Sequence, residues 1–427
     1  MGALELTLFL LVNLAFSLDF VDLVVRIYLR RQHTTTLIGG AAPATSVVLD
    51  VGAFAPYQIK MHVRPFAIVA SVYNASDDIH RFLMAMEPLR DRVWIIDDHS
   101  SDNTADIIEA AGFRCLRAPV NSGKPAALKT LVESLPPGIE SIVVMDPDVR
   151  IITSTDELLQ IIFELQRSGM AALTPRVAAA GSNWLARIQQ LEYCIACSLG
   201  RKSLADYTIT SGVAIYRASA LRRVFAEHSL SVYAEDFENT LILLAAGEQI
   251  YYDGRFVIET DAMPTVRRLF SQRVGWYFGL LRVYWLRWRS IWKRALKHAH
   301  FAYQYIAYTG VFVLLLHPLK ILGLGVMVVS AANMIDNAAH LESIPDVTLT
   351  NPLYFVSAYG QCLMFILLAW ITGVGGGDRL TVLPILPIYP LYAMGHLVPA
   401  TVGFMNWFSV QLWRRRIFRD HYQAAEP

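Results

Sequence analysis

The apolar residues of this chain are gathered into a few long runs, and this feature most constrains what the chain can fold into. The runs cover residues 4–27, 303–334, 353–374 and 380–410. Hydrophobic residues make up 54% of the 427 residues and charged residues only 17%, whereas soluble domains usually carry about 25% charged residues. An apolar helix of about 20 residues crosses the hydrocarbon core of a bilayer. The sequence therefore predicts a multi-pass membrane protein with about four spans.

The first apolar run is interrupted by acidic side chains, which leaves two interpretations open. Glu5, Asp19 and Asp22 lie within it. A cleaved signal peptide would begin with basic residues, but here the basic cluster follows the run, at residues 26–31. Basic residues favour the cytosolic side of a membrane. This order therefore favours an anchor with its N-terminus outside and the next domain in the cytosol.

The same charge rule predicts the topology of the C-terminal part. Residues 267–302 are too charged to cross a bilayer, and their aromatic and basic composition suits amphipathic helices in the interface. The loop 336–351 holds acids but no Lys or Arg and is expected outside, whereas the basic tail 413–416 is expected inside. An inside tail requires an even number of crossings after the cytosolic domain, but three apolar runs follow it. One of these runs must therefore be interfacial, re-entrant or a double pass. The favoured candidate is 380–410, which four prolines interrupt.

The segment between the first and second apolar runs alternates short β-rich runs with helical patterns. Buried strands are expected at residues 66–72, 93–96, 113–116 and 141–145, and helices at 77–89, 101–111 and 125–134. This alternation predicts an α/β domain with a mostly parallel sheet and helices on both faces. The expected organisation is an N-terminal span (1–31), a linker (32–63), the α/β domain (64–266), interfacial helices (267–302) and a C-terminal membrane region (303–427).

Charge and cysteine content exclude several classes of protein. Net charge is +1, and no soluble segment combines a basic groove with aromatic residues, so no nucleic acid partner is expected. The four cysteines indicate no disulfide framework. Cys194 and Cys197 lack the second pair or nearby histidine of a zinc site, so we interpret them as packing on a helix. The spacing of a P-loop is absent, which excludes an ATPase of that type.

Polar residues follow three of the predicted strands, where an α/β sheet binds its ligands. They are Tyr73-Asn74, Asp97-Asp98 and Asp146-Pro147-Asp148. Asp146 and Asp148 are two residues apart, so both can bind one Mg²⁺ or Mn²⁺ ion that is shared with a diphosphate. The alternative is an ordinary solvated turn. After the second strand, Ser100 or Ser101 can also cap the next helix, alone or beside a ligand held by the aspartates.

Three further segments contain residues suited to phosphate or sugar chemistry. Asn121-Ser122-Gly123-Lys124 combines a Gly loop and a lysine with the start of a helix, which suits a diphosphate. Residues 234–238 gather three acids, one of which can act as a general base if its pKa is raised. The alternative is that these acids only stabilise a helix N-terminus. Residues 272–276 offer an arginine to a phosphate and a tryptophan to a sugar ring, although such interfacial helices are usually only anchors.

In this order, these motifs resemble the membrane-bound family 2 glycosyltransferases, the group of hyaluronan, chitin, cellulose and capsular polysaccharide synthases. The resemblance covers residues 64–276 and extends loosely to 386–392. It is carried by Ser71-Val72-Tyr73-Asn74, Asp97-Asp98, the segment 121–124, Asp146-Pro147-Asp148, Thr210-Ser211-Gly212, Glu235-Asp236 and Gln272-Arg273-Val274-Gly275-Trp276. It implies a GT-A type domain that binds a nucleotide sugar and is inserted between transmembrane helices.

The resemblance also implies roles for individual residues. The donor, a UDP-sugar, would be bound by Tyr73, Asn74, Asp97, Asp98, Lys124, Asp146, Gln272 and Arg273. Mg²⁺ or Mn²⁺ would be bound by Asp148 directly, together with Asp146. Asp236 would be the general base, with Glu235 as its catalytic neighbour. The acceptor, a growing polysaccharide or a lipid, would meet Ser211, Gly212 and Trp276. Such enzymes invert the anomeric centre by direct displacement, without a covalent sugar-enzyme intermediate.

Two residues depart from the family pattern. Gly275 stands where an arginine is usual, and Ala234 where a threonine usually precedes Glu-Asp. The missing guanidinium removes one phosphate clamp, which Arg267 or Arg282 can replace, and it bears on processivity more than on the reaction class.

We favour a processive polysaccharide synthase that also passes its product through its membrane helices. The first alternative is a non-processive transferase that adds sugar to a lipid. A transporter or receptor whose domain only binds nucleotides is disfavoured by the few predicted spans and by the ordered acidic motifs.

Overall fold

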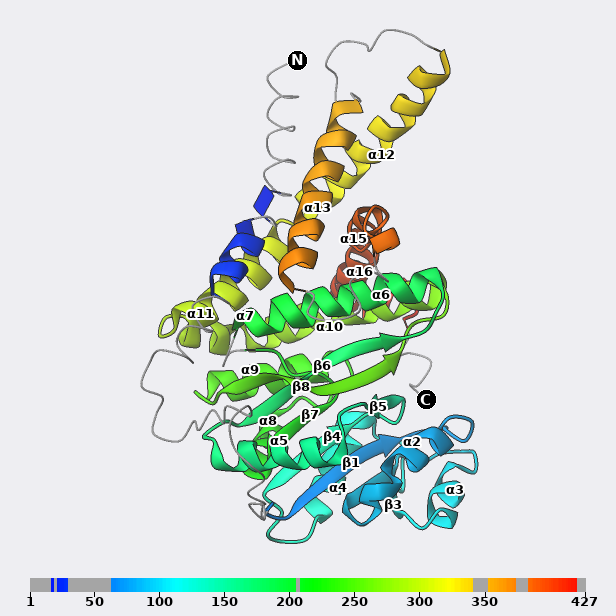
Figure 1. Ribbon diagram of the computed structural model, residues 1–427, viewed down its shortest axis with the longest axis vertical. Coiled ribbons are helices and arrows are strands. Elements are labelled where there is room, and N and C mark those ends of the chain that lie inside the picture. The colour runs from blue at the N-terminus through cyan, green and yellow to red at the C-terminus, as the bar shows by residue number, and fades with distance from the viewer. Residues whose placement is uncertain are drawn as a thin grey trace, which may run out of the picture. The chain divides into compact units, whose positions relative to one another are not determined.

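The computed structural model describes residues 17–18, 21–29, 63–204, 208–340, 352–373 and 383–420. The chain divides into two compact units (Figure 1). We call one the sheet unit; it comprises Leu29–Ala180 and Arg201–Asp261, with the last two residues of the chain. The other, the helical unit, comprises Met1–Tyr28, Gly181–Gly200 and Ala262–Ala425. The expected α/β domain thus differs from the sheet unit, because residues 181–200 group with the helices. The linker predicted at 32–63 lies outside the described residues, except for residue 63.

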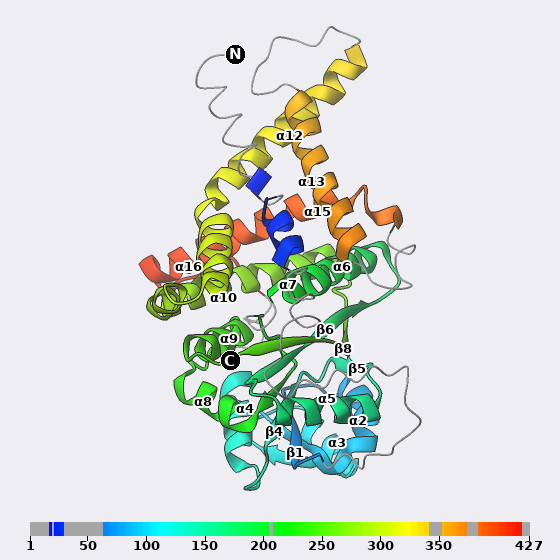
Figure 2. The same ribbon diagram turned by 60° about the vertical axis from the view of Figure 1, so that its left-hand side comes forward.

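The sheet unit is built on an eight-stranded sheet with the order β3-β2-β1-β4-β7-β6-β8-β5. The strands are β1 (Phe66–Val72), β2 (Val93–Asp97), β3 (Arg114–Arg117), β4 (Ser141–Met145), β5 (Val149–Ile151), β6 (Ala172–Ala180), β7 (Ala214–Arg217) and β8 (Ile250–Asp261). The first four include the strands predicted from the sequence, with bounds that differ by at most one residue. Figure 2 shows β6 and β8 as long neighbouring strands, which pair in parallel.

The sheet is mixed, but all of its strands except β5 and β7 run in the same direction, so it is mostly parallel as the sequence predicts. β1 pairs in parallel with β2 and β4, and β2 pairs in parallel with β3. However, β7 is antiparallel to both β4 and β6, and β5 is antiparallel to β8. The prediction rested on β1, β2 and β3, each of which is followed by a helix that leads to another parallel strand. It did not consider the later strands, whose direction a buried apolar pattern does not reveal.

The helices of the sheet unit bury one apolar face each. They include α2 (Ile79–Met86), α3 (Thr104–Ala110), α4 (Lys124–Ser134), α5 (Thr155–Arg167), α8 (Ala218–Glu227) and α9 (Glu235–Ala245). In α5, Ser154 caps the first turn by accepting a hydrogen bond from the Glu157 amide. Its buried residues recur at helical spacing, at Leu158, Ile161 and Leu165. Each side chain buried in this way contributes about 1.5–3 kcal/mol.

The helical unit contains most of the remaining apolar runs. Its elements are α6 (Trp184–Ile195), α10 (Val266–Ala295), α11 (Ala299–Ala302), η3 (Tyr303–Leu315), α12 (His317–His340), α13 (Pro352–Gly373), η4 (Leu383–Ile385), α15 (Tyr389–Gly395) and α16 (Leu397–Trp413). Within the described parts of the chain, no single helix is both long and apolar enough to cross a bilayer. The pair Ala299–Leu315 and His317–Val329, bent by 44°, passes that test by length and composition.

The interruptions predicted from proline and histidine are present. The bend of 44° falls at Leu316, directly before His317 and Pro318. The proline-rich run 380–410 is divided into η4, α15 and α16, with Pro390 in the first turn of α15. The part of the loop 336–351 beyond residue 340 lies outside the described residues, as does most of the first apolar run.

One acidic interruption of the first run has a partner. Asp22 forms an ion pair of 2.8 Å with Arg26 and accepts a hydrogen bond of 2.6 Å from the Tyr303 hydroxyl. Arg26 also donates to Gln304 and is 6% exposed. This arginine, which the sequence analysis counts within the basic cluster, is therefore a buried pairing residue rather than a surface charge.

Candidate active site

The three polar strand ends meet at one edge of the sheet, as the sequence predicts. In the parallel registers Val72 lies beside Asp97, and Ala70 lies beside Met145. Tyr73 and Asp146, which follow β1 and β4, therefore leave the sheet at the same edge as Asp97.

Asp98 positions the loop that leads into α4. Its carboxylate accepts hydrogen bonds from the Gly123 amide at 2.7 Å and from the Ser122 amide at 2.9 Å. Gly123 has a φ of 81°, a backbone conformation in which a residue with a side chain is strained. Asp98 is 2% exposed, and these bonds occupy both of its oxygens. The structure therefore gives it a part in placing Lys124, the first residue of α4. Its predicted contact with the donor stays a prediction.

Asp97 has a free oxygen in a buried position. Its Oδ2 accepts a hydrogen bond from the Ser100 amide at 3.1 Å, whereas its Oδ1 is buried without a hydrogen-bond partner among the described residues. Asn74, in the left-handed region at φ 48°, accepts from the Ser101 amide and fixes the loop after β1 to the loop after β2. An unpaired buried acceptor is costly, so Oδ1 suits a ligand N–H or O–H. Tyr73, which directly precedes Asn74, is exposed.

Lys124 joins the acids of two different segments. Its Nζ lies 2.5 Å from an Asp146 oxygen and 2.8 Å from a Glu235 oxygen. Burial opposes the lysine charge, but the two carboxylates outweigh it and raise the pKa of Lys124 well above its usual value. Lys124 therefore stays protonated and presents a fixed cation to this site.

Asp148 is the carboxylate that suits a divalent cation. It makes no ion pair or hydrogen bond with another side chain of the described residues. Partial desolvation by the surrounding protein, together with the negative charge of Asp146, raises the pKa of Asp148 to about 6. A bound cation would relieve both effects, and two oxygen-donor side chains match Mg²⁺ or Mn²⁺. Within the described part of the chain, no three His, Cys, Asp or Glu side chains are grouped for metal binding. A substrate would therefore have to complete the coordination shell.

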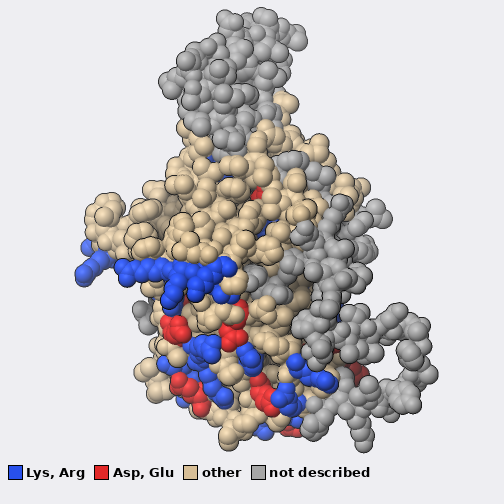
Figure 3. Space-filling model, turned by 90° about the vertical axis from the view of Figure 1, so that its left-hand side faces the viewer, with Lys and Arg blue, Asp and Glu red and all other residues tan. Residues whose placement is uncertain are grey.

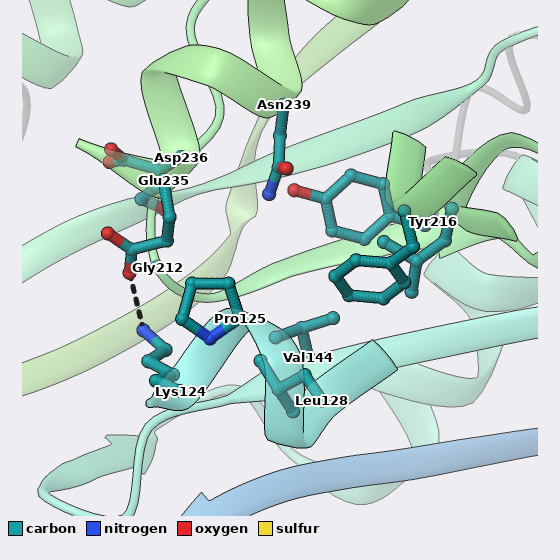
Figure 4. Close-up of a pocket in the computed structure, with 12 residues that line it drawn as sticks. Lys124, Pro125, Leu128, Val144, Gly212, Tyr216, Glu235, Asp236 and Asn239 are labelled. Carbon is teal, nitrogen blue, oxygen red and sulfur yellow. Dashed lines mark hydrogen bonds and ion pairs between the residues drawn. The ribbon is translucent and has the colours of Figure 1, made fainter. Parts of the chain in front are cut away.

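Asp236 lies in the first turn of α9, next to Glu235 (Figure 4). The residue before this pair, Ala234, adopts a left-handed conformation with a φ of 53°, which costs energy in a non-glycine residue. Burial raises the pKa of Asp236 to about 7, with a further contribution from the charge of Glu235. Glu235 itself points to Lys124 and is paired with it. Asp236 is therefore the better proton acceptor of the two.

The segment before β7 brings the acids of β4 and α9 together. The Thr210 hydroxyl donates to the backbone oxygen of Asp236 at 2.8 Å. Gly212 lies so close to Asp146 that an added Cβ would come within 2.4 Å of its carboxylate. A side chain at this position would displace the Asp146 carboxylate that pairs with Lys124. The Ser211 hydroxyl donates to the Val213 oxygen at 2.6 Å, so its predicted acceptor contact stays a prediction.

A small cavity lies behind the acids, between α4, β7, α8 and α9 (Figure 4). It has a volume of about 20 Å³, which accommodates one water but no sugar. Besides Lys124, Gly212, Glu235 and Asp236, its walls include Tyr216 and Asn239. Neither of these two residues was predicted from the sequence. Asn239 could have been found from its spacing, because it follows Asp236 by three residues on one helix face.

The predicted residues of the interfacial stretch lie on α10 in the helical unit. Arg273 is 1% exposed and forms an ion pair of 2.8 Å with Glu192 of α6. Its guanidinium lies 3.8 Å from the ring centroid of Trp276, and it donates to Gln272 at 3.3 Å. Glu192 also accepts a hydrogen bond from the Tyr392 hydroxyl. Gln272, Arg273 and Trp276 thus form one network inside this unit, and their predicted contacts with donor and acceptor stay predictions.

Comparison with known proteins indicates the class of the sheet unit. Residues 67–225 match the sequence model of the family described as Glycosyl transferase family 2. The matched segment contains Tyr73, the Asp97-Asp98 pair, Lys124, the Asp146–Asp148 motif and Gly212. This match agrees with the family that the motifs indicate.

Two relatives and one solved structure extend this comparison. A poly-beta-1,6-N-acetyl-D-glucosamine synthase of Staphylococcus epidermidis is 27% identical over 241 residues, which are 52% of this chain and 57% of that protein. An N-acetylglucosaminyltransferase of Rhizobium leguminosarum bv. viciae is 22% identical over 43% of this chain and 47% of its own length. The chain thus matches about half the length of these curated relatives.

The mannosyltransferase PcManGT from Pyrobaculum calidifontis, solved with GDP-Man and Mn²⁺, resembles the chain over 95% of its residues and 99% of that structure. The TM-score is 0.53 and the sequence identity 14%. At this identity the likeness concerns the fold alone, which is of the GT-A α/β type.

Proposed function

We propose that this protein is an inverting glycosyltransferase that takes sugar from a UDP-sugar and elongates a polysaccharide. One observation carries the proposal: the Asp146–Asp148 pair, the fixed cation of Lys124 and the Asp236 carboxyl meet at one edge of the sheet. The pKa of that Asp236 carboxyl is raised to about 7. These are the groups needed to hold a diphosphate and to accept a proton from an acceptor hydroxyl near neutral pH.

The transfer would proceed in one displacement. Asp236 accepts the proton of the acceptor hydroxyl while that oxygen forms a bond to C1 of the donor sugar. The bond from C1 to the β-phosphate oxygen breaks, and UDP leaves with the bonding electrons. Lys124 stabilises the charge on the departing diphosphate. A Mg²⁺ or Mn²⁺ ion held by Asp148 and Asp146 would supply further charge stabilisation when bound.

We propose that the nucleoside of the donor binds at the same edge of the sheet, at the ends of β1 and β2. The free Oδ1 of Asp97 can accept a hydrogen bond from the base or the ribose, and the exposed Tyr73 offers a ring to the base. Asn74 and Asp98 act on the donor by holding the loops that carry these groups and Lys124.

The proposal that the product is a polysaccharide is based on what the names of the two relatives say. Both act on N-acetylglucosamine by name, and one of them makes a polymer. We therefore propose UDP-N-acetylglucosamine as the first donor to test, processive elongation, and passage of the product through the membrane helices. A non-processive transfer to a lipid acceptor is the second candidate. The absence of a guanidinium at Gly275 favours it, because a clamp of the family pattern is missing there.

We further propose that the chain is a multi-pass membrane protein with the sheet unit in the cytosol. In α10, Trp285, Trp288 and Trp292 are exposed among basic residues, as in helices that lie at a membrane interface. Exposed apolar side chains also occur on α13 and α16. Figure 3 shows one face on which Lys and Arg gather in a band beside a broad surface with few charges.

A donor screen on the purified chain in lipid tests the proposed function. UDP release would be measured for a panel of UDP-sugars with Mn²⁺ or Mg²⁺, and the size of the product would be determined. We expect release from at least one UDP-sugar and a polymeric product. A product with one added sugar would support the second candidate, and no release from any donor would contradict both.

A further inference from the structure

A second cation of the sheet unit, Arg201, lies near the proposed base and has no role in the account so far. Its Nη1 donates hydrogen bonds to the Pro175 oxygen at 3.0 Å and to the Thr174 hydroxyl at 3.3 Å. Thr174 is fully buried, and its hydroxyl lies 3.5 Å from that of Ser211. Arg201 is therefore fixed to β6 at one end, beside the segment that leads to Gly212.

No adjacent carboxylate of the described residues neutralises the charge of Arg201. Other partly buried arginines of the sheet unit have one: Arg150 pairs with Glu259 at 2.8 Å, and Arg217 with Glu248 at 2.7 Å. Arg201 forms no ion pair with the described residues, and its Nε and Nη2 have no hydrogen-bond partner among them. The negative charge that it does sense is that of Asp236, whose pKa it lowers. A partly buried guanidinium with free donors is unfavourable until an anion binds it.

The position of Arg201 beside β6 indicates which of the two substrates would carry an anion that binds it. In the strand order β2-β1-β4-β7-β6, the nucleoside residues follow β1 and β2, and the metal-binding aspartates follow β4. Arg201 is anchored on β6, two strands beyond β4 on the opposite side. Asp236 lies between, because Thr210, which leads to β7, holds its backbone. The anion therefore belongs to the molecule on the far side of the base from the donor.

We propose that Arg201 binds a carboxylate or phosphate group on the acceptor, and that the acceptor sugar is therefore anionic. This inference rests on the proposed function, because it takes Asp236 as the base that faces the acceptor. It specifies the acceptor as a sugar that bears a carboxylate or that is linked to a phosphate. A planar guanidinium with two free nitrogen donors matches either group bidentately.

Matched pairs of soluble acceptors test this with the full chain in lipid and UDP-N-acetylglucosamine as donor. One pair is methyl β-glucuronide and methyl β-glucoside; the other is N-acetylglucosamine 1-phosphate and methyl β-N-acetylglucosaminide. We expect kcat/KM to be about 10-fold or more higher for the charged member of one pair. The pair that shows the difference distinguishes a carboxylate from a phosphate.

Arg201→Gln should lower kcat/KM for the charged acceptor about 10- to 100-fold, the usual effect of losing a hydrogen bond to a charged group. For the neutral acceptor the same variant should lower kcat/KM by a smaller factor, because the loss of Arg201 raises the pKa of Asp236 for both acceptors alike.

The controls separate recognition from a structural effect. Arg201→Lys keeps the charge and should retain part of the preference. Arg223→Gln removes an exposed guanidinium that is paired with Glu248 and should change neither acceptor. Equal loss for charged and neutral acceptors in Arg201→Gln, or equal use of both by the unmutated protein, would overturn the inference. Turnover with neutral acceptors alone would overturn it and leave the proposed function standing. No UDP release even to water from any UDP-sugar would overturn both.

Discussion

At the scale of single residues, the same cluster of charges gives Lys124 and Asp236 opposite tasks. Asp146 and Glu235 keep Lys124 protonated, so it can only serve as a cation. Burial and the adjacent Glu235 make Asp236 reluctant to ionise, so it can accept a proton near neutral pH. When one environment moves the pKa values of neighbouring groups in different directions, the acid, base and cation roles can be assigned from it.

The pH dependence of transfer follows from the raised pKa of Asp236. A base must be ionised to accept a proton, and Asp236 is protonated below its pKa of about 7. We therefore expect kcat/KM to fall as the pH is lowered through about 7, by about tenfold per unit well below it. The measurement is UDP release between pH 5 and 9 at saturating metal, with UDP affinity followed as the control. A constant rate down to pH 5 would mean that Asp236 is not the base.

Asp148→Ala tests the proposed metal site. Its carboxylate has no side-chain partner among the described residues and lies next to the charge of Asp146. Without it, the affinity for UDP in the presence of Mn²⁺ should fall by at least about 10-fold, and the affinity without metal should not change. Calorimetric titration with UDP measures both. The matched control is Asp156→Ala, an exposed carboxylate of α5. Metal-independent binding of UDP by the unmutated protein would refute the assignment.

Residues that lie in sequence motifs could be predicted, and residues that reach the site from elsewhere could not. Asp97, Asp146 and Asp148 could be placed at one edge of the sheet from the sequence, because polar residues that follow parallel strands meet there. Arg201 was missed because it lies in no motif, and its position depends on a bond to β6 that the sequence does not show. Tyr216 was missed because a tyrosine within an apolar strand is normally interpreted as core.

At the scale of secondary structure, the first half of the sheet could be predicted and the second could not. β1, β2 and β4 are short buried runs, each bounded by polar residues, so their positions follow from the pattern alone. β6 and β8 are separated by a strand and several helices, and their pairing depends on tertiary contacts that no local pattern encodes. The mixed character of the sheet follows from these later pairings.

The packing of α16 on α10 allows a prediction within the helical unit. A Cβ at Gly403 would lie 2.7 Å from the Val274 oxygen and 2.9 Å from the Phe278 nitrogen, both in the backbone of α10. Gly403→Ala should therefore destabilise the protein by about 1–3 kcal/mol, as overpacking does. At Gly325 of α12 an added Cβ meets nothing within 4 Å, so Gly325→Ala should be neutral or stabilising by up to about 1 kcal/mol. Thermal unfolding in lipid compares the two variants. If Gly403→Ala is as stable as Gly325→Ala, the helices do not pack in this way.

At the scale of the whole molecule, we propose that the chain combines a catalytic sheet unit with a helical unit that lies in a membrane. The helical unit shows why composition alone did not determine the number of spans. Proline and histidine divide the apolar runs, so that 380–410 becomes three short elements and 303–334 becomes a bent pair. Charged residues within the apolar runs are equally ambiguous, because Asp22 and Arg26 neutralise each other.

The proposed topology is tested by cysteine labelling in sealed vesicles. Starting from a variant without its four native cysteines, single cysteines would be placed as Asn351→Cys and Gln423→Cys. We expect a membrane-impermeant reagent to label the first from outside and the second only after permeabilisation, because basic residues precede Gln423 and none occur in the loop 336–351. Labelling of Gln423→Cys from outside would contradict an inside tail.

The central claim is that Asp236 accepts a proton during glycosyl transfer from a UDP-sugar. Asp236→Asn keeps the shape of the side chain and removes its basicity, so turnover should fall about 10²- to 10⁴-fold, while UDP affinity stays within about twofold. Glu133→Gln, which changes an exposed acid of α4, serves as the matched control and should retain full turnover. The measurement is UDP release at saturating donor and metal, compared with UDP binding on the same preparations. Near-normal turnover in Asp236→Asn would contradict the assignment of Asp236 as the base.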